Sequence, residues 1–215
     1  MINLKKKSSF FILIFFFFNS FFFSVYSELN NKILVKVGSE IITSLDLQNE
    51  IITNLVINKQ EINQENINQI KDYSIKNLIN KKIKLIEIKK YEIKEYNKKD
   101  LNDYLLNIAS SRFETNIFGL KDIFKKNNIN FDSFSKNFEI ELLWNTLIFS
   151  MYKNQTNINL IEVENELDKY KNSKTIDELT EIKKKILDQK KQEKLNLFSR
   201  THFSNLENSI QINFL

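Results

Sequence analysis

The sequence predicts a mainly α-helical protein with a multi-helix core and one small β-sheet. The 215 residues include no proline and only two glycines, so few residues interrupt helices. Apolar side chains recur at helical spacing over most of the chain. Strand-like patterns are confined to residues 33–42 and 209–214, which lie far apart in the sequence. A lone terminal strand needs a partner, so we expect the two segments to form one sheet.

The expected hairpin lies at residues 33–42, where a β-branched run is followed by the turn signal Gly38-Ser39. The helix after it begins at Thr43, a hydroxyl N-cap with an acidic residue three positions later. Asparagines mark the starts of later helices, and Asn127-Asn128 marks a helix end because Asn tolerates the left-handed conformation. Helices are expected near residues 44–57, 65–91, 97–108, 116–126, 132–152, 159–170 and 176–203.

The first 27 residues have the parts of a secretory signal peptide. A basic start at residues 5–7 precedes residues 10–23, which are apolar except for two polar side chains. Val25 and Ser27 then place a branched and a small side chain at the two positions that a signal peptidase reads. We expect export and cleavage after Ser27. A retained membrane anchor is the alternative, but a spanning helix needs about 20 apolar residues, more than this run provides.

Charge and cysteine content restrict the function classes. The chain has 32 basic and 27 acidic residues, and removal of the leader leaves 29 basic residues against the same 27 acidic ones. These charges alternate along the expected helices, so nucleic acid is not an expected partner. There is no cysteine to form disulfides. A chain of this length can bury about two thirds of its unfolded surface without them.

No catalytic or metal-binding pattern is found. His202 is the only histidine, and we interpret it as a surface or helix-cap residue. With one histidine and no cysteine, the usual soft metal ligands are missing. Glu162, Glu164 and Glu166 could bind a cation, but an exposed helix face explains them better. The two glycines stand 81 residues apart, so they form no phosphate loop. We therefore expect no enzyme activity, metal or cofactor.

Residues 33–47, ILVKVGSEIITSLDL, resemble the strand, turn, strand and helix cap of the N-terminal region of the SurA family of periplasmic chaperones. Residues 78–85, LINKKIKL, are similar to the long helix of that family. Residues 128–134, NINFDSF, are similar too, with Asn128 where the family commonly has glycine. Residues 186–215 resemble the C-terminal helix and closing strand.

The resemblance implies one composite domain after the signal peptide. Residues 28–172 correspond to the N-terminal helical domain, and residues 173–215 supply the C-terminal helix and strand that complete it. Family members usually carry one or two parvulin-type prolyl isomerase domains between these parts, each of about a hundred residues with glycine-rich turns and site histidines. Only a short linker near Asn172 stands there in this chain. The resemblance therefore implies the chaperone part without the isomerase.

The expected function is that of an ATP-independent periplasmic chaperone for unfolded outer-membrane proteins or other exported chains, with transient approaches to the membrane. Such a chaperone binds its clients through apolar and aromatic surface and backbone hydrogen bonds. Outer-membrane strands, which alternate apolar and polar residues, are suitable clients. The alternatives are a prolyl isomerase-related protein and a membrane-anchored assembly or scaffold factor. The sequence does not indicate an oligomeric state.

Aromatic residues are concentrated between positions 113 and 149. At helical spacing most of them belong in the core, but some could line a client groove. Phe113 and Phe118 flank a helix junction and are the best candidates for exposure. The client-binding candidates are Phe113, Phe118, Phe124, Phe131, Phe134 and Trp144.

Overall fold

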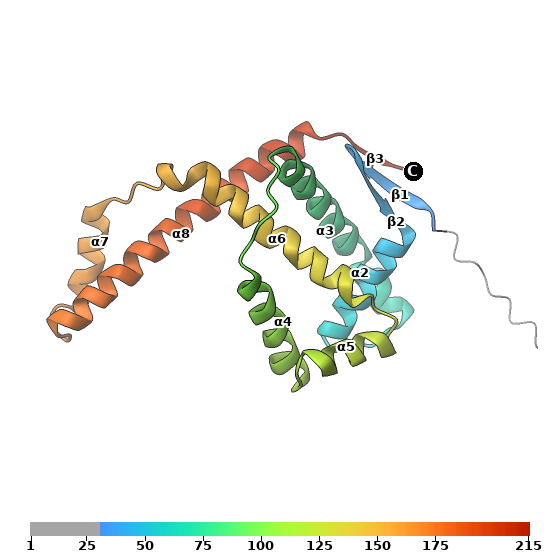
Figure 1. The fold of residues 1–215 in the computed structure, drawn as a ribbon, viewed down its shortest axis with the longest axis horizontal. Helices are drawn as coiled ribbons and strands as arrows, with labels where there is room; N and C mark the ends of the chain where they lie inside the picture. Colours follow the sequence, from blue (N-terminus) through green and yellow to red (C-terminus); the bar gives the residue numbers. More distant parts are fainter. Residues whose placement is uncertain (1–30) are drawn as a thin grey trace, which may run out of the picture. The chain divides into compact units, whose positions relative to one another are not determined.

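The computed structural model describes residues 31–215, and the predicted signal peptide lies outside them (Figure 1). Residues 32–215 form one unit that is mainly helical with a small three-stranded sheet, as predicted. The elements are β1 (Ile33–Val37), β2 (Glu40–Thr43), α2 (Ser44–Ile57), α3 (Gln64–Lys90), α4 (Lys98–Phe113), α5 (Ile117–Lys126), α6 (Phe131–Tyr152), α7 (Leu160–Leu167), α8 (Ile176–Ser209) and β3 (Ile212–Phe214). Short 3-10 turns follow α6 and α7.

The sheet joins the two ends of the described chain. Its strand order is β2-β1-β3, and both pairings are antiparallel. Val35 lies opposite Phe214 and Val37 opposite Ile212, which confirms the expected pairing of the hairpin with the C-terminal strand. Gly38 turns β1 into β2 with φ of 53°, a conformation that glycine adopts at little cost. Its N–H donates to the carbonyl of Gln211 at 2.9 Å, so the turn also fixes the start of β3.

Asparagine and threonine begin every α-helix within residues 31–215. Each N-cap side chain accepts a hydrogen bond from a backbone N–H two or three positions later, which stabilises a helix by about 1 kcal/mol. Thr43 and Thr175 complete capping boxes with Asp46 and Glu178. Asn130 caps α6, so this helix begins at Phe131 rather than at the expected Asp132 or Ser133. The other caps are Asn63, Asn97, Asn116 and Asn159.

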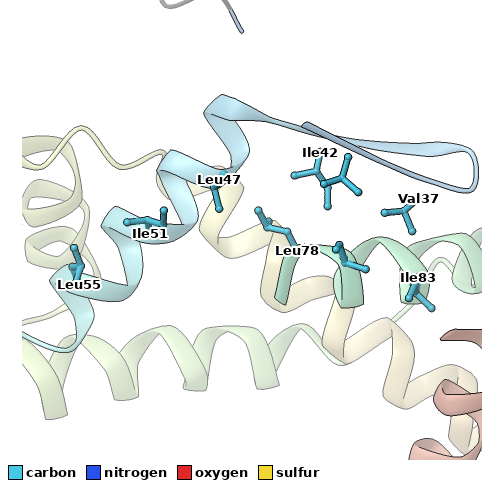
Figure 2. Close-up of a cluster of buried hydrophobic side chains, with 9 residues drawn as sticks. Val37, Ile42, Leu47, Ile51, Leu55, Leu78 and Ile83 are labelled. Carbon is cyan, nitrogen blue, oxygen red and sulfur yellow. The ribbon is translucent and has the colours of Figure 1, made fainter. Parts of the chain in front are cut away.

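The inner face of the sheet packs on α2 and α3 to form the first core cluster, which Figure 2 shows. Ile42 from β2, Leu55 from α2 and Ile83 from α3 are fully buried there. A second cluster joins α4, α5 and the start of α6, and a third joins α3, α6 and α8. The buried members of the first cluster are Val35, Val37, Ile42, Leu47, Ile51, Leu55, Leu78, Ile79 and Ile83.

Helix α8 packs near both ends and is mostly exposed between them. Towards its start, α8 lies beside α7 (Figure 1). Ile186 is buried there with Val163 and Leu167 of α7 in a fourth cluster. Towards its end, Phe203 and Leu206 pack against the first and third clusters. The helix continues to Ser209, six residues beyond its expected end, before the chain enters β3. No helix within residues 31–215 is both long enough and apolar enough to cross a membrane.

Candidate functional site

The six aromatic candidates occupy three kinds of position. Phe118 is 79% exposed on α5, while Phe113 and Phe131 are half-buried. Phe124, Phe134 and Trp144 are buried. Contact of Phe113, Phe118 and Phe131 with a client stays a prediction. The burial of Phe124, Phe134 and Trp144 corrects the expectation that these three line a surface.

The burial of these three residues has a physical reason. Phe124 and Phe134 meet edge to face, with ring centroids 5.0 Å apart, where α5 and α6 cross. Trp144 lies on α6 and donates its indole N–H to the hydroxyl of Ser199 on α8 at 2.8 Å. The large rings therefore join neighbouring helices instead of facing solvent.

A hollow of about 520 Å³ opens between α2, α3 and α6, and we call it the α2–α3–α6 groove. Its volume falls within the range of about 300–1,000 Å³ that is usual for ligand pockets. Helix α6 and the loop before it form one wall, and α2 and α3 form the other. The lining residues are Leu45, Asp46, Asn49, Leu78, Lys81, Lys82, Leu85, Asn128, Asn130, Ser133, Lys136, Asn137, Glu139, Ile140 and Leu143.

Apolar side chains from all three helices line part of the groove. Leu78 is buried beneath it, and Leu45 at its lip is 55% exposed. Leu45 occupies the first turn of α2 because the Thr43 capping box starts the helix just before it. An apolar ligand group placed here loses contact with water on several sides. The apolar lining residues are Leu45, Leu78, Leu85, Ile140 and Leu143.

Side-chain amides line another part of the groove. The Oδ1 of Asn49 accepts from the backbone N–H of Asn130 at 3.0 Å, which holds the α5–α6 loop against α2. The Oδ1 of Asn130 caps α6 by accepting from the N–H of Ser133 at 2.9 Å. Asn128 keeps this loop short by adopting the left-handed conformation, with φ of 55°. Within the described residues, the Nδ2 groups of Asn49 and Asn130 donate no hydrogen bond in the protein.

A buried carboxylate supports the groove from below. Glu50 accepts from the Nζ of Lys81 at 2.9 Å with each of its two oxygens. It also accepts from Asn77 at 2.7 Å and from Asn137 at 3.4 Å, so it connects α2 with α3 and α6. This network satisfies both oxygens of the buried Glu50 carboxylate.

The lysines of the groove differ in their pairing. Lys81 is neutralised by Glu50, and Lys82 lies 4.0 Å from Glu40. Lys136 on α6 forms no ion pair with any residue between 31 and 215. Asp46 is engaged in the cap of α2, where it accepts from the N–H and the hydroxyl of Thr43 at 2.9 Å. Apolar side chains, amides and charged side chains therefore line the groove, and Lys136 is the lining lysine that has no ion pair among the described residues.

A second buried polar network corrects the expectation for His202. The imidazole is mostly buried between α3, α6 and α8 rather than at a surface or a helix cap. Its Nε2 lies 3.2 Å from Glu87, and its Nδ1 lies 2.9 Å from the hydroxyl of Tyr152. Burial, followed by the charges of Tyr91 and Glu87, raises the pKa of Tyr152 above its ordinary value of 10.0. The network holds the three helices together.

Sequence reasoning missed both Glu50 and Glu87, although a signal was present. Glu50 falls between Leu47 and Ile51 on the buried stripe of α2. Glu87 falls four residues after Ile83 on the buried stripe of α3. A carboxylate on an apolar stripe needs a buried partner. The two positions could therefore have been recognised as ion-pair or hydrogen-bond centres, but not their partners.

The three acidic residues of α7 are paired with lysines of α8. Lys190 lies 3.7 Å from Glu162 and 3.3 Å from Glu166, and Lys183 forms an ion pair with Glu164. These pairs connect the two helices across their exposed edge. No group of three or more potential metal ligands occurs in the part of the chain that the structure describes.

No model of a known protein family matches the chain. No curated protein matches it significantly either. The chemistry of the α2–α3–α6 groove is therefore the basis on which a function is proposed.

Proposed function

We propose that this chain is an ATP-independent chaperone of the periplasm. It holds extended, unfolded segments of outer-membrane proteins during export and assembly, and it has no isomerase activity. The observation that carries the proposal is the α2–α3–α6 groove. It places apolar side chains beside side-chain amides whose N–H donors are unused among the described residues. The signal peptide expected at residues 1–27 and the resemblance to the SurA family support the location.

The apolar lining explains how a client would be held weakly. Burying one Leu or Phe side chain of a client contributes about 1.5–3 kcal/mol. Ordering an extended segment costs a comparable amount of free energy for each residue that is fixed. A groove that accepts one or two such side chains therefore binds reversibly, which lets a client leave without ATP.

The amides explain how the groove could bind client segments of many different sequences. An Asn side chain carries a donor and an acceptor in the same arrangement as a peptide group. Among the described residues, the Nδ2 groups of Asn49 and Asn130 donate to no acceptor, and both side chains lie beside the apolar wall. Backbone carbonyls of an extended client need such donors when they leave water. These contacts depend on the main chain and not on the client's side chains.

Outer-membrane strands match this combination of surfaces. Their residues alternate between apolar and polar, so an extended segment has one apolar edge and one polar edge. The apolar edge fits against Leu45, Leu85 and Leu143, and the backbone meets the amides. A short acidic side chain on the same segment would reach Lys136.

Aggregation of a urea-unfolded outer-membrane protein after dilution tests the proposal by light scattering. The exported chain at several-fold molar excess is expected to suppress scattering. Leu45→Glu is expected to weaken suppression, because it places a charge at the apolar lip, while an acid in the first turn leaves α2 intact. Leu106→Glu is the matched control, since Leu106 is 41% exposed on α4 and lies outside the groove.

Two results would contradict the proposal. One is unsuppressed scattering in the presence of the unmodified chain. The other is an equal loss of suppression in Leu45→Glu and Leu106→Glu, which would show that the groove has no special part. Circular dichroism of each variant checks that its helices are retained.

A further inference from the structure

The outer edge of β3 is one of the two edges of the sheet among the described residues. In the order β2-β1-β3, β1 is paired on both sides, and β3 pairs with β1 alone among residues 31–215. A strand at such an edge presents backbone donors and acceptors that another extended chain can use.

The hydrogen bonds to β1 show which backbone groups face outward. Gly38 donates to the carbonyl of Gln211, and Leu215 donates to the carbonyl of Leu34, both at 2.9 Å. Bonding groups alternate along an antiparallel strand, so residues 211, 213 and 215 face β1. Ile212 and Phe214 therefore direct their N–H and C=O groups away from the sheet.

Apart from its length of three residues, this edge has none of the features that usually prevent strand addition. The sequence Ile212-Asn213-Phe214 has no lysine, no proline and no bulge in its pairing with β1. Phe214 is 69% exposed. The opposite edge strand, β2, carries Glu40, whose carboxylate is paired with Lys89 at 2.6 Å. A charged residue thus protects one edge of the sheet, whereas no charged residue, proline or bulge protects the other among residues 31–215.

We propose that the β3 edge binds an extended client segment as a fourth strand of the sheet. This inference rests on the proposed function, because the ligand class is the same alternating polypeptide. Phe214 lies opposite Val35 in the register and on the same face, so its ring continues the apolar inner face of the sheet. Apolar residues of the added strand pack against this ring while its backbone pairs with Ile212 and Phe214.

The short length of the edge favours a client over a second copy of this chain. A specific protein–protein interface buries about 1,200–2,000 Å². An edge of three residues that pairs with its own copy provides only a few hydrogen bonds and one exposed ring on each side. A contact of this size is too small for a stable dimer, but it suits a segment that must be released.

A proline at position 214 tests the edge directly. Phe214→Pro removes one outward N–H without removing any hydrogen bond to β1, and proline is tolerated on an edge strand with its nitrogen facing solvent. Phe214→Ala is the matched control, because it removes the ring and keeps the N–H. The probe is a soluble fluorescein-labelled peptide in which Val or Tyr alternates with Thr or Gln. Its affinity for the exported chain is measured by fluorescence anisotropy.

We expect Phe214→Pro to weaken peptide binding by about fivefold relative to Phe214→Ala, as the loss of one hydrogen bond implies. Amide hydrogen exchange at Ile212 and Phe214 is expected to slow when peptide is bound to the unmodified chain. Equal affinities for the two variants, or unchanged exchange at both amides, would overturn the inference. Concentration-dependent protection of these amides without peptide would overturn it too, in favour of self-association.

Failure of this inference can be told apart from failure of the proposed function. If Leu45→Glu weakens peptide binding and Phe214→Pro does not, the groove is the client site and the edge is not. If the unmodified chain binds no peptide and suppresses no aggregation, both proposals are wrong. If Phe214→Pro alone weakens binding, the edge is supported without the groove.

Discussion

Glu50 on α2 and Lys81 on α3 form a buried ion pair in which both carboxylate oxygens lie 2.9 Å from the ammonium nitrogen. The side chains are 7% and 13% exposed, so water screens the pair poorly. Asn77 and Asn137 add hydrogen bonds to the same carboxylate. This pair fixes α2 against α3 beneath the groove.

Removing one member of this pair should be costly. Glu50→Gln leaves the Lys81 ammonium buried without its counter-ion, and we expect a loss of about 3 kcal/mol in the free energy of unfolding. Urea denaturation followed by circular dichroism measures the change. The control is Asp103→Asn, which breaks the exposed pair of Lys99 and Asp103 at 3.8 Å and should cost no more than about 0.5 kcal/mol.

The double variant Glu50→Leu with Lys81→Met should be less destabilised than the sum of its single variants. Both charges disappear together, so neither is left unpaired in the interior. A loss in Glu50→Gln as small as that in Asp103→Asn would show that the pair is hydrated in solution.

Ser74 offers a stabilising substitution. It is fully buried on α3, and its hydroxyl has no hydrogen-bond partner within the described residues. Because a buried hydroxyl without a partner costs free energy and Ala favours helices, Ser74→Ala should raise the free energy of unfolding by about 1 kcal/mol. Ser111→Ala is the control, since that exposed hydroxyl donates to its own helix. A loss of stability in Ser74→Ala would mean that the hydroxyl has a partner in solution.

The sequence predicted those parts of the fold that depend on local signals. Asn97, Asn116 and Asn159 were expected to begin helices, and each caps one. The pairing of the two distant strands was also predictable, because strand-like patterns occur only at residues 33–42 and 209–214 and a strand needs a neighbour. Helix-capping residues and the small number of strand-like segments were sufficient to predict these helix starts and this strand pairing.

The groove was not predictable from the same signals. It forms where α2, α3 and α6 meet, and its residues are spread from Leu45 to Leu143. Helical spacing shows that Phe124, Phe134 and Trp144 lie on apolar stripes, but it does not show which stripe another helix covers. The contact of His202 with Glu87 was not predictable for the same reason, because Glu87 precedes His202 by 115 residues.

Glu114 ends α4 in an unfavourable conformation. Its φ is 53°, the left-handed region that glycine adopts far more easily than glutamate. A negative charge at a helix C-terminus is unfavourable as well. Glu114→Gly should therefore raise the free energy of unfolding by about 1 kcal/mol in urea denaturation. A glycine placed inside the helix instead, Asn102→Gly, should lower the free energy of unfolding. A Glu114→Gly variant that is no more stable than the unmodified chain would contradict this account of the helix end.

Glu178 at the start of α8 should make this end of the helix sensitive to acid. The backbone N–H of Thr175, the ammonium of Lys174 and the Thr175 hydroxyl together lower the pKa of Glu178 from 4.5 to about 2. A lowered pKa in the folded state stabilises the fold above pH 4.5, and this contribution is lost as the pH falls through about 2. Leu179 and Ile182 follow directly and pack against α7, so this end of α8 should loosen over that range.

A titration followed by NMR of the Glu178 side-chain carboxyl measures the effect. The midpoint should lie near pH 2 in the unmodified chain. It should rise towards 4.5 in Lys174→Met and in Thr175→Val, each of which removes one of the hydrogen bonds that favour the charged form. Neither variant should bring it fully to 4.5, because the backbone N–H of Thr175 still donates at 2.9 Å. A midpoint near 4.5 in the unmodified chain would show that the capping box at Thr175 is open in solution.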